Sequence, residues 1–343
     1  MSLPVDRLLP TEEAHALLDL TRELAEKELA PQVRDLEARA EFPAAAYALL
    51  GQSGLKGLPF AEEFGGGAQP YEVYLQVIEE LAMVWPSVAV GMSVHTLTVS
   101  VLDTHGTAEQ RAEWLPRMLG GDWLGAYALS EPQAGSDVNA IRTRAQRDGD
   151  DYVLTGVKQW ISNGSHADYY VLFARTSDAA RGGLSCFLIT ADSAGLSFGA
   201  PERKLGLHCD VTTQVILDQV RVPAARRIGA EGDGMRIALG ALDGGRLGIA
   251  AVGTGLAHGA LAQAVAYAGQ REQFGQKIGE FQGMQFLLAD MAARVERSRA
   301  MYLHAARLKD SGRPFARQAS IAKLGATDSA MAVATDAIQV FGG

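Results

Sequence analysis

Two serines and a glycine stand out in the stretch "YALSEPQAGSDVNAIRT", residues 127–143, because their types and spacing could hold a polar ligand. The hydroxyls of Ser130 and Ser136 can donate hydrogen bonds to ring carbonyls or phosphate oxygens, and Gly135 lets backbone N–H groups approach a ligand closely. The stretch therefore predicts a strand that runs into a ligand-binding loop. An exposed β-turn with ordinary serine and glycine is the competing interpretation.

A second candidate lies in "GVKQWISNGSHADYY", where Trp160 and Ser162 are two residues apart. On a strand, residues at this spacing share one face. An indole beside a hydroxyl suits a planar heteroaromatic ring that also needs a hydrogen bond. The alternative is an ordinary core tryptophan.

The third stretch is "AGQREQFGQKIGEFQGMQFLLADMA". We expect Arg271 to end a helix, where it could pair with an anion such as pyrophosphate, and Gln282 to begin the next one. Phe274, between them, could stack on a ring. An isolated arginine at a helix end is otherwise a solvated cation.

These three stretches must be positioned by a helical segment, a β segment and a second helical segment. From Thr11 to about residue 119 apolar residues recur at helical spacing, with Thr11 as the expected N-cap and Pro31 as a helix breaker. From Trp123 to Pro223 short β-branched and aromatic runs alternate with turn signals. Helical texture then returns, with long helices expected near 235–270, 280–311 and 315–341.

The expected fold class is α+β, with an N-terminal helical domain (1–120), a central antiparallel β domain (121–228) and a C-terminal helical bundle (229–343). A β module between helical domains offers clefts for a flat cofactor. The length and the 48% hydrophobic content allow a large core.

The net charge and the absence of several known motifs exclude some classes of function. A net charge of −9 and a pI near 5.3 argue against nucleic acid and anionic lipid as partners, and we expect no membrane span and a cytoplasmic protein. Cys186 and Cys209 suit buried hydrophobic positions better than a redox pair. The histidines lack metal-binding spacings, so no metal is expected. "GTGLAHG" departs from the dinucleotide fingerprint and is better explained by close helix packing.

In order and spacing, the chain resembles the acyl-CoA dehydrogenase family over essentially its whole length. The stretches that carry the resemblance include "PFAEEFGGG", "YALSEPQAGSD", "GVKQWISNG", "ALDGGRLGIAA", "REQFGQKIGEFQGMQF" and "ATDAIQVFGG". Short- and branched-chain members look most similar. The resemblance implies noncovalent FAD, oxidation of an acyl-CoA thioester to a trans-2-enoyl-CoA, and electron transfer to an electron-transferring flavoprotein.

The resemblance also implies residue roles. It assigns the isoalloxazine and nearby phosphates to Tyr127, Leu129, Ser130, Gly135, Ser136, Trp160, Ile161 and Ser162. It assigns the adenine and pyrophosphate end of FAD on a neighbouring subunit to Arg271, Phe274, Gln282, Gln339, Gly342 and Gly343. A homo-oligomer, a dimer of dimers, follows from that sharing. The thioester substrate is assigned to Ser136, Leu242, Asp243 and Arg246.

The catalytic base is the point at which the sequence departs from the family. The usual glutamate is expected about 25 residues beyond the glycine pair, past Gly343, and we expect that the chain is C-terminally incomplete rather than naturally short. A minority of members carry the base one residue before the arginine of "LDGGR", which is Gly245 here. Gly244 offers no carboxylate, and Asp243 matches a substrate-contacting position, so the base is unassigned.

Smaller departures are Gln133, where a glycine is common, and His208 and Cys209, where the family often has Arg and Ser before an acid. Because of these departures, the resemblance does not predict the detailed structure of the "LHCD" loop. An acyl-CoA oxidase or flavin monooxygenase on the same fold, or a flavin-binding member without dehydrogenase activity, remains the alternative to a dehydrogenase.

Overall fold

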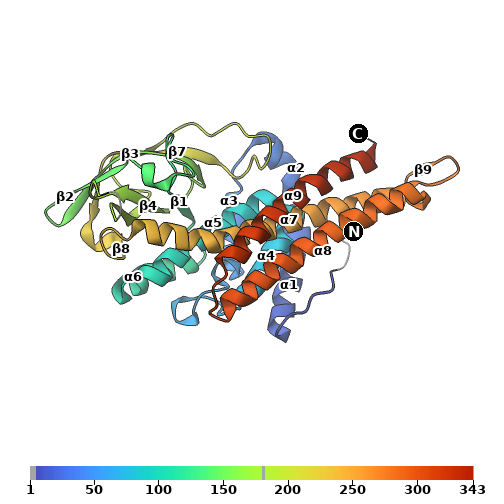
Figure 1. The fold of residues 1–343 in the computed structure, drawn as a ribbon, viewed down its shortest axis with the longest axis horizontal. Coiled ribbons are helices and arrows are strands. Elements are labelled where there is room, and N and C mark those ends of the chain that lie inside the picture. Colours follow the sequence, from blue (N-terminus) through green and yellow to red (C-terminus); the bar gives the residue numbers. More distant parts are fainter. Residues whose placement is uncertain (1–4, 180–181, 343) are drawn as a thin grey trace. The chain divides into compact units, whose positions relative to one another are not determined.

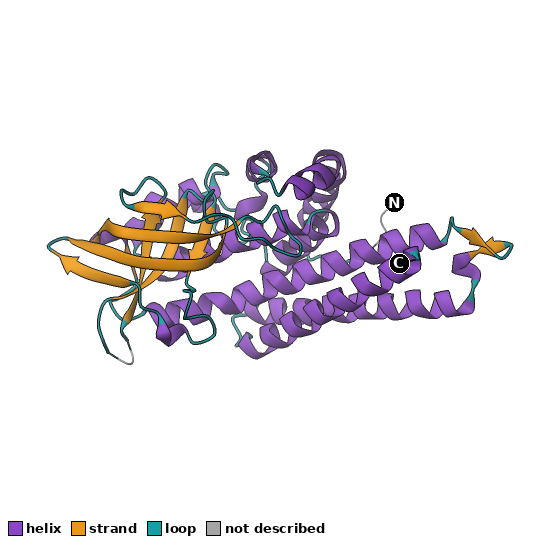
Figure 2. Ribbon diagram, turned by 90° about the horizontal axis from the view of Figure 1, so that it is seen from above, coloured by secondary structure: helices purple, strands orange, loops and turns teal. Residues whose placement is uncertain are grey.

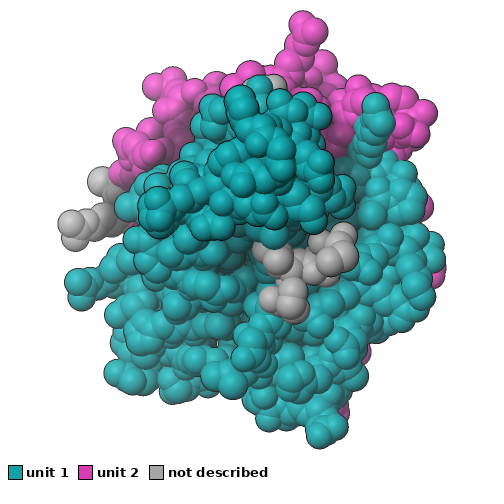
Figure 3. Space-filling model, turned by 90° about the vertical axis from the view of Figure 1, so that its right-hand side faces the viewer, with its two compact units in different colours: residues 1–34, 69–90, 246–343 teal, residues 35–68, 91–245 magenta. Residues whose placement is uncertain are grey.

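The computed structural model describes residues 5–179 and 182–342. The chain forms two compact units (Figure 3). Unit 1 combines Met1–Arg34, Gln69–Val90 and Arg246–Gly343, and unit 2 combines Asp35–Ala68 and Gly91–Gly245. Three helices contribute residues to both units: α2 (Ala30–Arg39), α5 (Pro86–His105) and α7 (Gly234–Ala268). The units therefore do not follow the order of the chain. The three-domain boundaries remain a prediction.

Helices dominate the first 120 residues, as predicted (Figure 1). Thr11 is the N-cap, since its side chain accepts a hydrogen bond from the Ala14 amide. Pro31 does not end the helix. A π-helical turn at Ala25–Leu29 precedes it, and Pro31 is the second residue of the next α segment, where a missing N–H is tolerated. The helices are α1 (Glu12–Leu24), α2 (Ala30–Arg39), α3 (Ala44–Gln52), α4 (Tyr71–Val84), α5 (Pro86–His105) and α6 (Ala108–Leu119).

Unit 2 is built around one eight-stranded sheet with the order β6-β7-β3-β2-β4-β5-β8, in which β1 pairs with β4 (Figure 2). Most pairings are antiparallel; β1 and β4 pair in parallel, and β2 meets β4 in parallel at one residue pair. The strands are β1 (Gly125–Ala128), β2 (Arg144–Asp148), β3 (Asp151–Ser162), β4 (Tyr169–Arg175), β5 (Leu184–Thr190), β6 (Leu196–Phe198), β7 (Thr212–Pro223) and β8 (Arg227–Ile228).

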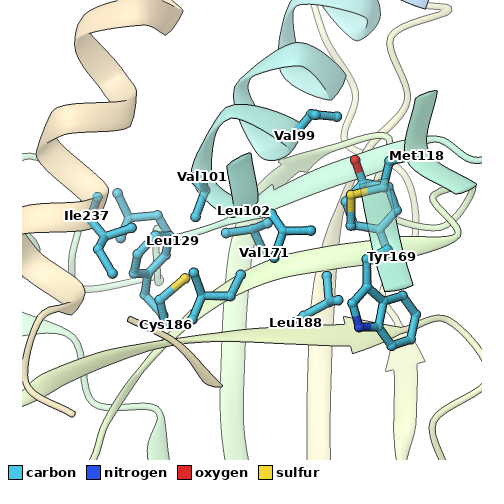
Figure 4. Packing of buried hydrophobic residues seen from close by; sticks show 14 of the residues in the cluster. Val99, Val101, Leu102, Met118, Leu129, Tyr169, Val171, Cys186, Leu188 and Ile237 are labelled. Carbon is cyan, nitrogen blue, oxygen red and sulfur yellow. The ribbon is translucent and has the colours of Figure 1, made fainter. Parts of the chain in front are cut away.

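The two faces of this sheet are buried differently. One face packs with helical residues of unit 2 into an apolar cluster that includes Leu102, Leu129, Cys186 and Ile237 (Figure 4). The other face forms a second cluster among the strands themselves. Cys186 and Cys209 are both buried and unoxidised, as the sequence predicts.

Unit 1 contains the long C-terminal helices, α7 (Gly234–Ala268, from residue 246 onward), α8 (Gln282–Asp310) and α9 (Ala316–Phe341). Their bounds agree with the three predicted segments. A small hairpin, β9 (Glu272–Gln273) and β10 (Gln276–Lys277), joins α7 to α8 and projects beyond their ends (Figures 1 and 2). Side chains of all three helices share one buried apolar cluster.

The "GTGLAHG" stretch has the packing role predicted for it. A Cβ at Gly255 would collide with the carbonyl oxygen of Glu79, and one at Gly259 with that of Met83. Both contacts lie on α4, so the two glycines let α7 and α4 approach closely within unit 1.

A buried ion network ties the chain's N-terminal segment into unit 1. The Glu79 carboxylate is fully buried and accepts hydrogen bonds from Arg7, Arg299 and Tyr302, while Arg7 also pairs with Glu80 at 2.8 Å. Burial opposes ionisation of Glu79, but the two guanidinium groups outweigh it and lower the pKa of this carboxyl to about 2.

Helix α7 is long and apolar enough to cross a membrane by length and composition, although the sequence predicts no membrane span. Because 67% of its most apolar window is buried inside the structure, it has the character of a core helix of a soluble protein.

Candidate active site

The loop after β1 is held against strand β3, which brings two of the predicted stretches together. The Lys158 ammonium donates to the carbonyl oxygen of Leu129 at 3.1 Å, and the Gln159 amide donates to that of Ser130 at 2.9 Å. Leu129 and Ser130 therefore lie beside the strand segment that carries Trp160.

A buried ion pair fixes this arrangement. Glu131 and Lys158 are joined at 2.8 Å with both side chains almost fully buried. The carboxylate also accepts from the amides of Arg142 at 2.7 Å and Thr143 at 3.0 Å, which closes the loop from residue 131 to residue 143. Burial opposes the charge on each partner, yet Lys158 lowers the pKa of Glu131 to about 2, whereas for Lys158 burial prevails and lowers its pKa to about 8.

Sequence reasoning missed this pair. The only hint in the sequence is that Glu131 and Lys158 carry opposite charges. They are 27 residues apart, and their contact depends on how the loop after β1 crosses β3.

Trp160 is displayed rather than buried. Its side chain is 55% exposed and its backbone has a φ of 58°, in the left-handed region that a bulky residue rarely adopts. The ladder between β3 and β7 shifts register between Lys158 and Ile161, which turns the indole outward. Ile161 is buried in the sheet cluster, so its side chain belongs to the core. The core-tryptophan alternative is thus wrong.

Ser162 ends β3, two residues from Trp160. Its hydroxyl donates to Oδ2 of Asp210 at 3.0 Å. Asp210 is buried, and burial raises the pKa of its carboxyl although Lys204 opposes the shift. Asp210 is a third residue, after Glu131 and Lys158, that sequence reasoning did not single out for a site.

The remaining residues of the first stretch differ in what they offer. Ser130 is half-buried, whereas Gly135 and Ser136 are exposed, and a Cβ added at Gly135 would meet no protein atom within 4 Å. Tyr127 is half-buried; its hydroxyl donates to the Ala238 carbonyl of α7 at 3.1 Å, and its ring packs 5.2 Å from that of Phe173. Tyr127 therefore braces the loop through α7.

These features fit a flat heteroaromatic ring. A half-exposed indole offers an apolar face, the neighbouring loop offers hydroxyls and open space, and Asp210 Oδ1 is a buried oxygen with no hydrogen-bond partner among the described residues. The described residues contain no group of three or more His, Cys, Asp or Glu side chains that could hold a metal ion.

The candidate substrate residues lie on α7 and on the loop. Leu242 is partly buried and packs against the apolar cluster that includes Leu129, in unit 2. Asp243 is half-buried one residue later. Arg246 is half-buried and falls in unit 1, while Ser136 belongs to unit 2. At Gly245 an added Cβ would lie 3.5 Å from the Leu97 methyl groups, an ordinary van der Waals distance.

In unit 1, Arg271 does not end a helix. Helix α7 stops at Ala268, and Arg271 instead precedes the β9–β10 hairpin, accepting from the Ile278 amide at 2.8 Å through its carbonyl. Phe274 and Gly275 form the two-residue turn, with φ values of 56° and 82°, typical of a tight hairpin. The Phe274 side chain is 95% exposed.

Three further unit 1 residues can be placed. Gln282 is the first residue of α8, as predicted, and it is exposed. Gln339 is exposed near the end of α9, and Gly342 caps that helix with a φ of 100°, a conformation that favours glycine. Gly343 lies outside the described residues.

Comparisons with known proteins identify the class to which this fold, with its β sheet between helical segments, belongs. Three family models match: acyl-CoA dehydrogenase N-terminal domain (residues 11–122), middle domain (126–220) and C-terminal domain (232–343). The chain belongs to the acyl-CoA dehydrogenase family. Enzymes of this family depend on FAD.

Individual relatives agree. The chain is 40% identical to "Acyl-CoA dehydrogenase, short-chain specific" of Clostridium acetobutylicum, covering 97% of this chain and 88% of the relative. It superposes on butyryl-CoA dehydrogenase from Megasphaera elsdenii with a TM-score of 0.96 and 37% identity, covering 99% and 90% of the two chains. A structure described as electron transferring flavoprotein of Acidaminococcus fermentans matches with a TM-score of 0.96 and 40% identity, covering 99% and 90%.

Proposed function

We propose that this protein dehydrogenates a short-chain acyl-CoA thioester between its α- and β-carbons, with FAD as cofactor and an electron-transferring flavoprotein as acceptor. The observation that carries the proposal is the exposed Trp160 indole, two residues from Ser162, on a strand segment that is hydrogen-bonded to the hydroxyl-bearing loop and joined to it by a buried ion pair. The names of the Clostridium and Megasphaera relatives favour a short acyl chain.

The chain's own residues would position the cofactor and exclude water. The Trp160 indole would cover one part of the ring system, while Ser130, Ser136 and Ser162 would hydrogen-bond its polar edge. Bound FAD supplies the acceptor for the β-hydrogen as hydride. Leu242 would contribute an apolar wall for the acyl group, since it packs against the cluster that includes Leu129.

Removal of the α-proton needs a carboxylate and a desolvated site, because the α-carbon of a thioester is a very weak acid in water. Asp243 is the acid nearest to the expected positions on α7, and we assign it to substrate contact rather than to proton abstraction. Gly245 is the position on the same helix where a minority of the family carries the base, and a Cβ there would make only ordinary contacts with Leu97. The base itself is unassigned among the described residues.

We propose further that a second copy of this chain completes the cofactor site. Phe274 is almost fully exposed at the hairpin tip, and helix α9 displays Ile321, Leu324, Met331 and Ile338 at spacings of three, seven and seven residues. Large apolar side chains along one helix face favour burial against a partner. A dimer of dimers in the cytoplasm, with Arg271, Phe274, Gln282 and Gln339 near the partner's FAD, is the arrangement we expect.

The function is tested by anaerobic mixing of the FAD-loaded protein with acyl-CoAs of increasing length and branching. Short-chain substrates should perturb or bleach the visible flavin band, and reoxidation should require an electron-transferring flavoprotein. Rapid reoxidation by air would identify an oxidase instead. A flavin band that no acyl-CoA alters would refute the proposal, and light scattering of the same sample tests the tetramer.

A further inference from the structure

One carboxylate holds the loop of residues 204–212, which includes the "LHCD" sequence. Glu37 Oε2 accepts from the amides of His208 at 2.8 Å and Cys209 at 3.3 Å. The His208 ring also lies 3.1 Å from the Lys204 carbonyl through Nε2. The two middle residues of this sequence are therefore held, and Asp210, its last residue, follows them directly.

Asp210 points at the end of β3. Asp210 is only 5% exposed, and its Oδ2 accepts a hydrogen bond from the Ser162 hydroxyl at 3.0 Å. Lys204 is the charge that balances it, with Nζ 3.5 Å from Oδ2 and a hydrogen bond to the Asp210 carbonyl. The second oxygen, Oδ1, has no hydrogen-bond partner within the described ranges 5–179 and 182–342.

A serine hydroxyl has one proton and two lone pairs. Since the Ser162 proton is directed to Asp210, the orientation of the hydroxyl is fixed and its lone pairs are what remains for a ligand. A charge-assisted hydrogen bond of this kind is stronger than a neutral one, so the orientation is well determined.

We propose that Asp210 is a positioning residue that fixes the Ser162 hydroxyl as a hydrogen-bond acceptor toward the bound cofactor. The inference rests on the proposed flavin site at Trp160 and Ser162. It gives the "LHCD" loop a role in that site: the amides of His208 and Cys209 hold the loop on Glu37, and Asp210, the next residue, orients the Ser162 hydroxyl.

A double-mutant cycle tests this dependence. The FAD dissociation constant of the apoprotein is measured by flavin fluorescence quenching for Asp210→Asn, Ser162→Ala and the double variant, together with the visible spectrum of each complex. Each single change should weaken binding about three- to tenfold, the size of one hydrogen bond. The double variant should bind FAD no more weakly than the single variant with the lower affinity. The visible spectrum of the double variant should equal that of Ser162→Ala.

Asp218→Asn is the matched control, because Asp218 is an exposed carboxylate on the neighbouring strand β7, and it should bind FAD as the wild type does. If Asp210→Asn does not fold, Lys204→Met/Asp210→Asn replaces it in the cycle, since the neutral residue would otherwise leave Lys204 unpaired. Multiplicative effects of the two changes, or no effect of Asp210→Asn, would overturn the inference. Trp160→Ala separates the two claims: unchanged FAD binding in that variant would refute the flavin site itself.

Discussion

Lys158→Met should destabilise the protein by about 3 kcal/mol. The side chains of Lys158 and Glu131 are 0% and 3% exposed, so the substitution leaves a carboxylate buried without its counter-charge. Removing one partner of such a pair typically costs about 3–5 kcal/mol. We expect the low end of that range because the Arg142 and Thr143 amides still donate to Glu131.

The double variant Lys158→Met/Glu131→Gln should recover most of this loss. The substituted amide side chain would carry no charge but keep a carbonyl oxygen for the loop amides, so the stability of the double variant should lie within about 1 kcal/mol of the wild type. Urea unfolding, followed by tryptophan fluorescence and far-UV circular dichroism, gives the free energies. Lys27→Met is the control: Lys27 pairs with Glu23 at the surface and its loss should change little.

The reasoning would be refuted in either of two ways. Lys158→Met could prove as stable as the wild type, or the double variant could prove no more stable than the single one. The first result would mean that the carboxylate is solvated in the folded protein, and the second that the loss comes from packing rather than from an unpaired charge.

Three further predictions concern activity, pH and assembly. Gly245→Glu should accelerate acyl-CoA bleaching of the flavin at least tenfold over Gly245→Gln, since a Cβ at this position makes only ordinary van der Waals contacts and a positioned base contributes about 10²–10⁴ in rate; equal rates would contradict this. Glu79 has its pKa lowered from 4.5 to about 2, so its stabilisation is present above pH 4.5 and is lost as the pH falls toward 2; denaturant titrations across this range should show a slope that Glu79→Gln reduces. Phe274→Ala should weaken both self-association and FAD binding while leaving the far-UV spectrum and the unfolding of the dilute subunit unchanged, because the side chain is 95% exposed; analytical ultracentrifugation would show an unaltered assembly if Phe274 has no role.

Local patterns were enough to predict much of this molecule. The apolar periodicities predicted the long helices, and the β-branched and aromatic run around Trp160 and Ser162 predicted the strand that carries both. The glycine of Phe274-Gly275, between short polar runs, is compatible with a hairpin turn. This turn explains why Arg271 lies outside a helix.

Contacts between distant segments could not be predicted in this way. Glu131 meets Lys158, and Ser162 meets Asp210 across 48 residues, because of the register between β3 and its neighbours. That register includes two shifts in the ladder between β3 and β7, and a slip of one residue would exchange the two faces of the strand. The hydrophobic pattern of a strand or loop does not indicate which distant residue its polar side chains will contact.

The buried network around Glu79 has a consequence for how the protein is made. Glu79 is neutralised by Arg7, which precedes it by 72 residues, and by Arg299, which follows it by 220. On the ribosome, Glu79 is therefore made long before α8 supplies Arg299, whereas all of unit 2 has been synthesised once residue 245 has emerged. Unit 1, which contains Glu79 and both of its arginine partners, is therefore the last of the two units to be completed during synthesis.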